Sequence, residues 1–222
     1  MPPAKPRGKR PPLTRERVVA AAVELADDEG IDSLSMRKLA QALGVEAMSL
    51  YHHVANKDEL LDGMEDVVFA EAYLPAADGP WIEELRTRCA SMREVLLRHP
   101  WGVGLLNSRR NPGMATLVHH DAVIASLRAG GFSIRGAAQA FAMLDSYTYG
   151  FVVQQLALPM ENGEDEGDLA EAVLGGLPDG ALPHLIEMAT DYVQREDYSF
   201  ANEFAPGLDL ILDTLERART TR

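Results

Sequence analysis

The sequence contains a single cysteine, Cys89, among its 222 residues. One thiol cannot close an internal disulfide, and it excludes a zinc site built from several cysteines. Long apolar runs are also missing, because none approaches the roughly 18 residues that a membrane-spanning helix needs. The basic residues 1–10 are not followed by an apolar segment, so they do not resemble a secretory signal. We therefore expect a soluble, cytoplasmic protein that makes no contact with a membrane.

Positive charge is scarce, and it is concentrated near the N-terminus. The net charge of −13 would by itself argue against a nucleic-acid partner. Residues 1–57, however, contain all four lysines and carry nine basic against seven acidic groups, a balance of +2. The remaining residues 58–222 carry 12 basic against 27 acidic groups, a balance of −15. This asymmetry indicates two parts with different partners, the alternative being a disordered basic leader on an acidic enzyme.

Signals for β-hairpins are absent as well. Neither Asn162-Gly163 nor Asp179-Gly180 lies between alternating apolar runs. Apolar residues instead recur at helical spacing between caps and stops, such as Thr14 before the first helix and Gly30 after it. The pattern predicts an all-α chain with helices at about 15–29, 35–43, 46–53, 57–74, 81–98, 112–129, 133–157, 181–195 and 199–218. Residues 159–180, rich in Gly, Asp and Glu, are predicted to form a loop around one short helix.

Three short helices near the N-terminus have the spacing of a helix-turn-helix. Ala40 is small enough for two helices to cross closely, and Gly44 can adopt the positive φ of the turn. Leu50 then supplies an apolar anchor on the next helix. With the helix caps and the local basic balance, this spacing predicts a DNA-binding domain. We expect a basic leader at 1–13, a three-helix helix-turn-helix domain at 14–58 and a larger helical domain at 59–222.

The outward face of the segment 46–53 follows from the rotation of about 100° per residue in a helix. If Leu50 points inward, Met48 and His52 point most directly outward, and Ser49 and Tyr51 flank them. We expect these side chains to meet DNA, because such groups can contact base edges or phosphates. His53 lies nearer the inner edge. The alternative for Tyr51 and His53 is packing against the first helix of the helix-turn-helix pair, at 35–43.

The stretch from Arg15 to Leu61 resembles the DNA-binding domain of the TetR family of transcriptional repressors, and the tetracycline-repressor branch is the most similar. The resemblance is carried by LSMRKLA at 34–40, LGV at 43–45 and SLYHHVANKDELL at 49–61. It implies phosphate contacts for Ser35, Arg37 and Lys57. It implies recognition-helix contacts for Ser49, Tyr51, His52 and His53. Ala47, Met48 and His52 stand where that branch carries a glutamine, a proline and a tryptophan, so we expect a different operator sequence.

The same resemblance implies a homodimeric, ligand-responsive regulator that acts as a repressor. It would bind a palindromic operator of double-stranded DNA and be released by a small-molecule effector held in the C-terminal domain. Apolar stripes on the helices at 133–157 and 199–218 would form a four-helix bundle between two subunits, or else face the core of one subunit. The candidate effector-binding residues are polar or aromatic groups on apolar helices: Trp101, His119, His120, Met143, Tyr147, Phe151 and Gln155. For Trp101 and Phe151 the alternative is plain core packing.

No metal or cofactor is expected. His119 and His120 are adjacent on a helix and point about 100° apart, so they cannot readily chelate one ion together. The sequence also contains no set of nucleophile, base and orienting group, and no glycine-rich phosphate loop. We therefore expect a regulator and not an enzyme, with a helical protein–protein adaptor as a further alternative.

Overall fold

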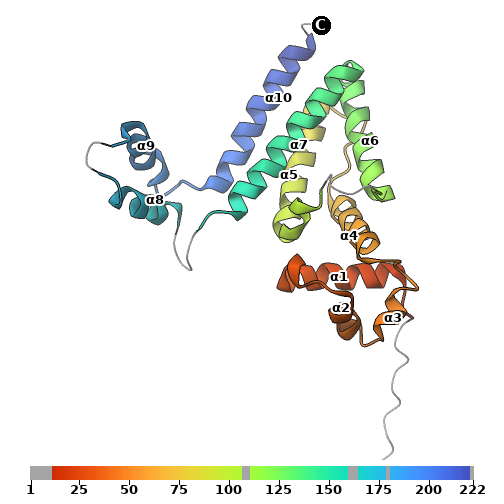
Figure 1. Cartoon of the computed structure of the whole chain (residues 1–222). Helices are drawn as coiled ribbons and strands as arrows, with labels where there is room; N and C mark the ends of the chain where they lie inside the picture. The colour runs from red at the N-terminus through yellow and green to blue at the C-terminus, as the bar shows by residue number, and fades with distance from the viewer. Residues whose placement is uncertain (1–11, 107–110, 160–164, 179–180, 221–222) are drawn as a thin grey trace, which may run out of the picture. The chain divides into compact units, whose positions relative to one another are not determined.

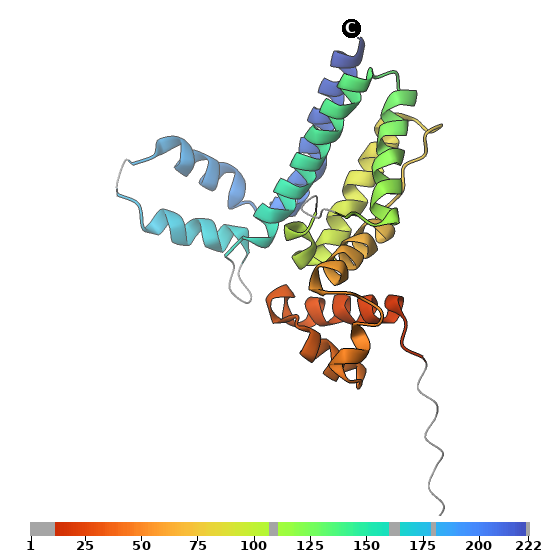
Figure 2. The same ribbon diagram turned by 45° about the vertical axis from the view of Figure 1, so that its right-hand side comes forward.

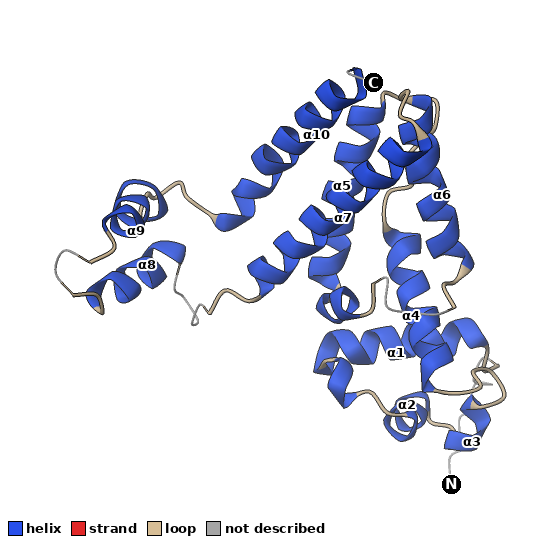
Figure 3. Ribbon diagram, turned by 45° about the horizontal axis from the view of Figure 1, so that its top comes forward, coloured by secondary structure: helices blue, strands red, loops and turns tan. Residues whose placement is uncertain are grey.

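The computed structural model describes residues 12–106, 111–159, 165–178 and 181–220. Within these ranges every regular element is helical and no strand occurs, as the sequence predicts (Figure 3). No helix there is long and apolar enough to span a bilayer. The basic residues Lys5 to Arg10 of the expected leader lie outside the described ranges.

The chain divides into two compact units. Unit 1 consists of Met1–Phe69 with Arg98–Thr116, and unit 2 consists of Ala70–Leu97 with Leu117–Arg222. The domain boundary predicted after residue 58 stays a prediction. In the structure, the first compact unit extends to Phe69 and also includes the later segment Arg98–Thr116.

Unit 1 begins with two helices whose ends follow from their capping residues (Figure 1). Helix α1 (Arg15–Glu29) starts after Thr14, whose hydroxyl accepts a hydrogen bond from the Arg17 amide, and stops at Gly30 with φ of 80°. Helix α2 (Met36–Leu43) starts after Ser35, whose Oγ accepts from the Lys38 amide at 3.2 Å. It ends at Gly44 in the left-handed region, with φ of 65°, as the helix-turn-helix prediction requires.

Helix α3 is shorter than predicted and covers only Ala47–Leu50. The predicted helix reached His53, but the His53 amide donates to the Leu50 carbonyl, three residues back, at 2.8 Å. This is the tighter spacing of a 3-10 turn, so the segment after Leu50 coils more closely than an α-helix. The turn lets both Leu50 and Val54 be buried in the core of unit 1.

Helix α4 (Lys57–Glu71) begins after Asn56, whose Oδ1 accepts from the Glu59 amide at 2.8 Å. The Glu59 carboxylate accepts in return from the Ala55 amide at 2.7 Å, one residue before the N-cap Asn56, so the arrangement resembles a capping box. Further along α4, a Cβ at Gly63 would lie 2.9 Å from Cγ2 of Val19 in α1. The absence of a side chain at Gly63 therefore allows α1 and α4 to approach closely.

Two carboxylates join the segment 98–116 to the rest of unit 1. Asp27 of α1 accepts from Nε1 of Trp101 at 2.6 Å and contacts Nδ1 of His99 at 2.8 Å. Trp101 lies in the 3-10 helix η2 (Pro100–Gly104). Asp66 of α4 accepts from both the amide and the hydroxyl of Thr116, at 2.8 and 3.0 Å. These bonds explain why a segment distant in sequence belongs to unit 1.

Unit 2 is built from α5 (Trp81–Arg98), α6 (Met114–Ala129), α7 (Ile134–Leu156) and α10 (Phe204–Thr220), apart from the ends of α5 and α6 that belong to unit 1 (Figure 2). The predicted bounds of α5 are confirmed, and those of α6 and α7 are matched to within two residues. The core holds apolar side chains from all four helices: Trp81, Leu85, Cys89, Val123, Leu127, Phe132, Ala137, Ala140, Leu144, Phe151, Phe204, Leu208, Leu212 and Leu215.

A second part of unit 2 contains α8 (Glu166–Gly175), α9 (Pro183–Met188), the π-helical turn Ala189–Val193 and the 3-10 turn Phe200–Glu203. Helix α8 is the short helix predicted within 159–180. It begins with a capping box in which Asp165 and Asp168 exchange hydrogen bonds with each other's backbone. Glu166 Oε1 accepts from the Ser199 hydroxyl and the Phe200 amide, both at 3.1 Å, which ties α8 to the chain before α10.

Candidate DNA-binding surface and effector unit

The outward side of α3 and the turn that follows it carry the side chains that the sequence predicts for base contacts. Met48 is 73% exposed and Tyr51 is 43% exposed, while Leu50 between them is fully buried. His52 is exposed as well, and Ser49 is half-buried. The predicted separation of an outer face from the Leu50 face is therefore present, although the helix itself is short.

The residues predicted to bind phosphate lie together at the start of α2. The Lys57 ammonium donates to the Leu34 carbonyl at 2.9 Å, which places it beside Ser35. Arg37 is exposed in the first turn of the same helix. The Ser35 hydroxyl accepts from a backbone amide as a cap and can still donate, and an ammonium bonded to one carbonyl retains further N–H donors. Hydroxyls, cations and a helix N-terminus are the groups that bind phosphate oxygens.

His53 differs from its neighbours because it is half-buried. It lies close enough to Glu16 of α1 for its charge to act on that carboxyl. The pKa of Glu16 is lowered mainly by backbone and Thr14 hydrogen bonds, and the charges of Arg15 and His53 lower it further. His53 therefore lies near α1, and its packing against the helix at 35–43, the alternative interpretation, stays a prediction.

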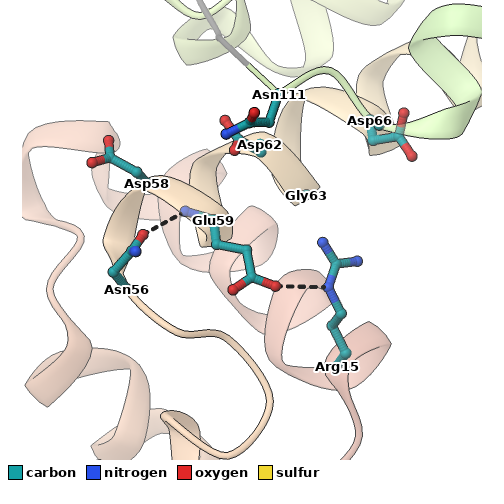
Figure 4. A pocket seen from close by; sticks show the side chains of 9 residues that line it. Arg15, Asn56, Asp58, Glu59, Asp62, Gly63, Asp66 and Asn111 are labelled. Carbon is teal, nitrogen blue, oxygen red and sulfur yellow. Dashed lines mark hydrogen bonds and ion pairs between the residues drawn. The ribbon is translucent and has the colours of Figure 1, made fainter.

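Unit 1 also has an acidic recess of about 530 Å³, shown in Figure 4. Asp58, Glu59, Asp62 and Asp66 line it, together with Arg15, Asn56, Gly63, Asn111 and Gly113. Arg15 Nε lies 3.7 Å from a Glu59 oxygen and offsets part of the negative charge. Phosphate would still be repelled by the remaining carboxylates, so this recess is not part of the candidate DNA-binding surface.

The interior of unit 2 contains a buried ion pair that sequence reasoning missed. Arg88 of α5 is 1% exposed and Asp145 of α7 is 6% exposed. Arg88 Nη1 lies 2.6 Å from Asp145 Oδ1, and Arg88 Nη2 donates to the Tyr149 hydroxyl at 3.4 Å. Burial alone would lower the pKa of the Arg88 guanidinium, but the Asp145 carboxylate, together with Tyr149 and Cys89, more than offsets this and raises it. Burial raises the pKa of the Tyr149 hydroxyl.

His119 of α6, a predicted effector residue, lies near this ion pair. It is 1% exposed, and burial lowers its pKa to about 3, with the Arg88 charge acting in the same direction. His119 is therefore neutral at pH 7. His120 is also shifted to a lower pKa by burial, and its ring packs edge-on against Phe141 at 5.3 Å between centroids.

Three other predicted effector residues lie together on α7. Gln155 Oε1 accepts from Nε and Nη2 of Arg93, at 3.0 and 2.8 Å. The Arg93 guanidinium carbon lies 5.5 Å from the centroid of the Phe151 ring. The Tyr147 hydroxyl donates to the Phe204 carbonyl at 2.8 Å. The sequence did not indicate Arg93 or Phe204, because each reaches this cluster from a helix distant along the chain.

The remaining two candidates lie elsewhere. Met143 is 44% exposed and lines a groove between α7 and α10. Trp101 belongs to unit 1, where its indole is bonded to Asp27. The structure thus separates a set that the sequence grouped together. Among the described residues no cluster of three or more His, Cys, Asp or Glu side chains is placed to hold a metal ion.

Known protein families match the sequence in both units. The model of bacterial regulatory proteins of the tetR family matches residues 18–64, and that of the tetracyclin repressor-like C-terminal domain matches residues 74–219. The chain belongs to the TetR family. It is a ligand-responsive transcriptional regulator and not an enzyme, and the resemblance noted in the sequence is confirmed over both units.

Individual TetR-family members show how far the likeness extends. An HTH-type transcriptional regulator of Saccharopolyspora erythraea is 42% identical over 151 residues, which are 68% of this chain and 64% of that protein. The class D tetracycline repressor of Escherichia coli is 34% identical over 92% of this chain and 89% of its own. The Streptomyces coelicolor TetR-family protein ActR, crystallised with actinorhodin, has 30% identity and a TM-score of 0.79, covering 94% of this chain and 99% of that one.

Proposed function

We propose that this TetR-family regulator acts in the cytoplasm as a homodimeric repressor. Each subunit would read one half of a palindromic operator through the segment 46–53. The observation that carries this proposal is the exposure of Met48, Tyr51 and His52 on α3 and the turn after it, in the same unit as the candidate phosphate-binding groups Ser35, Arg37 and Lys57. A single helix-turn-helix covers a short stretch of groove, so two copies give the length that a specific site needs.

The surface for dimerisation in this proposal is the groove between α7 and α10. It has a volume of about 700 Å³, and its lining includes Gly136, Met143 and Leu215, with Arg128 and Arg219 also present. The flanking residues Ile134 and Leu210 are 71% and 69% exposed. Apolar area of this kind on two long helices is suited to a four-helix bundle with the same helices of a second copy.

The effector in this proposal is a small molecule held inside unit 2. The cluster of Tyr147, Phe151 and Gln155 around Arg93 offers aromatic faces beside hydrogen-bonding groups, a combination found in ligand sites. A second set of polar side chains that an effector could contact in unit 2 is the buried Arg88–Asp145 pair with the neutral His119. Since a buried ion pair is costly to desolvate and adds little net stability, its presence in the interior supports a role in recognition.

The test is operator selection with the full-length protein, followed by affinity measurements on the enriched duplex. Tyr51→Ala should weaken binding about 5- to 150-fold, since the loss of a contact to a base edge costs on the order of 1–3 kcal/mol. Tyr192→Ala is the matched control, because Tyr192 is a tyrosine of similar exposure, 45%, in unit 2. Failure to enrich any sequence with folded protein, or equal affinities of both variants and wild type, would contradict the proposal.

A further inference from the structure

Met48 is a large apolar side chain on the surface that is proposed to enter the DNA groove. Its exposed fraction of 73% is the highest among the exposed large hydrophobic side chains of the described residues. Leu50 fixes the other side of α3 in the core, and the Ser49 amide donates to the Glu46 carbonyl at 2.9 Å. The backbone under Met48 is thus held in place while its side chain is free to reach a partner.

The residues around Met48 lack the side chains that read purines. Residues 47–53, AMSLYHH, contain no arginine or lysine for the O6 and N7 atoms of guanine. They contain no asparagine or glutamine for the paired N6 and N7 atoms of adenine. Ser49 and His52 can hydrogen-bond to several bases and so discriminate weakly. The distinguishing features left in the major groove are the N4 amino group of cytosine, from which an acidic side chain such as Glu46 can accept, and the C5-methyl group, which only thymine among the normal bases carries. The apolar Met48 side chain matches only the methyl group.

We propose that Met48 is a specificity-determining residue that reads the C5-methyl group of a thymine in each operator half-site. This inference rests on the proposed DNA-binding function. The thioether side chain is unbranched and polarisable, so it can follow the outline of a methyl group at the edge of a base. Contact would remove both apolar groups from water, and no hydrogen bond of the base pair would be disturbed.

The size of the effect follows from the methyl group alone. Burying one methyl-sized apolar group changes an affinity by about 4-fold. Replacing the thymine by deoxyuridine removes this methyl group and leaves every hydrogen-bonding atom in place. The comparison therefore isolates the apolar contact from all other contacts with that base pair.

The experiment uses the duplex enriched by wild-type protein in the operator selection. Each thymine is replaced singly by deoxyuridine, and the dissociation constants are measured by fluorescence anisotropy for wild type, Met48→Ala and Met48→Leu. We expect at least one thymine per half-site at which deoxyuridine weakens wild-type binding about 4-fold. Met48→Ala should lose this sensitivity to the methyl group, and Met48→Leu should keep most of it.

Met114→Ala provides a matched control. Met114 begins α6 and is 71% exposed, so it is a methionine of nearly the same exposure outside the α2–α3 motif. This variant should retain the full 4-fold sensitivity. Because Met48 and Met114 are both on the surface, neither alanine variant is expected to unfold, and circular dichroism checks this.

Two results would overturn the inference. One is that no thymine replacement changes wild-type affinity, and the other is that Met48→Ala keeps the wild-type sensitivity at the same position. In both cases the enriched operator would still show that the protein reads DNA, so the proposed function would stand. If the selection enriches no sequence at all, the proposed function and this inference both fail.

Discussion

The buried ion pair of unit 2 leads to a prediction about stability whose size follows from the structure. Asp145→Leu leaves the Arg88 guanidinium, which is 1% exposed, without the carboxylate 2.6 Å away. An uncompensated buried charge costs about 3–5 kcal/mol, whereas replacing both partners by apolar residues of similar volume is often neutral. We therefore expect Asp145→Leu and Arg88→Met each to be strongly destabilising, and the double variant to be close to wild type.

Thermal unfolding followed by circular dichroism measures this difference. For a chain of this length, 1 kcal/mol corresponds to about 2–4 °C in Tm, so each single variant should melt roughly 6–20 °C below wild type. All samples need the same protein concentration, because dimerisation also raises Tm. A loss below about 1 kcal/mol for Asp145→Leu, or additive losses in the double variant, would show that Asp145 does not compensate the buried Arg88 charge.

Three further predictions concern other parts of the chain. Gly63→Ala should lower the free energy of unfolding by about 1–3 kcal/mol in denaturant titrations, since the new Cβ would lie 2.9 Å from Val19. Lys57→Ala should weaken binding to all duplexes and reduce the salt dependence of affinity by about one unit of log–log slope, whereas an unchanged slope would remove Lys57 from the phosphate contacts. The pKa of His119, about 3, lies below its ordinary value, so its contribution to stability is complete above about pH 6.5 and falls as the pH drops toward 3. His119→Asn should reduce this acid sensitivity in stability measurements from pH 4 to 7, whereas the same change at the exposed His184 should not.

The helix ends of unit 1 could be predicted because local chemistry determines them. Thr14 and Ser35 are caps with hydroxyl acceptors, and Gly44 adopts the left-handed conformation that the turn demands. The end of α3 could not be predicted in this way. It depends on burying Leu50 and Val54 together, which is a tertiary requirement.

The interior of unit 2 was harder to predict because its contacts join distant residues. Arg88 and Asp145 come from different helices, and nothing in the local sequence of α5 marks Arg88 as buried. One signal was available, since Asp145 is the only carboxylate in the 23 residues of α7. A single carboxylate on a long apolar helix needs a buried cation as its partner, because an unpaired buried charge is costly. The bond between the Trp101 indole and Asp27 of α1 could not be predicted either, because it joins residues 74 positions apart, and an effector contact of Trp101 stays a prediction.

Hydroxyl-radical footprinting of the wild-type protein on its enriched operator shows whether a dimer reads a palindromic site. We expect two protected regions related by symmetry, with centres about 10 base pairs or a multiple of this apart, because each recognition segment of a dimer enters the major groove on the same side of the duplex. A single protected region, or uniform weak protection along the duplex, would mean that the protein does not read a palindromic operator as a dimer.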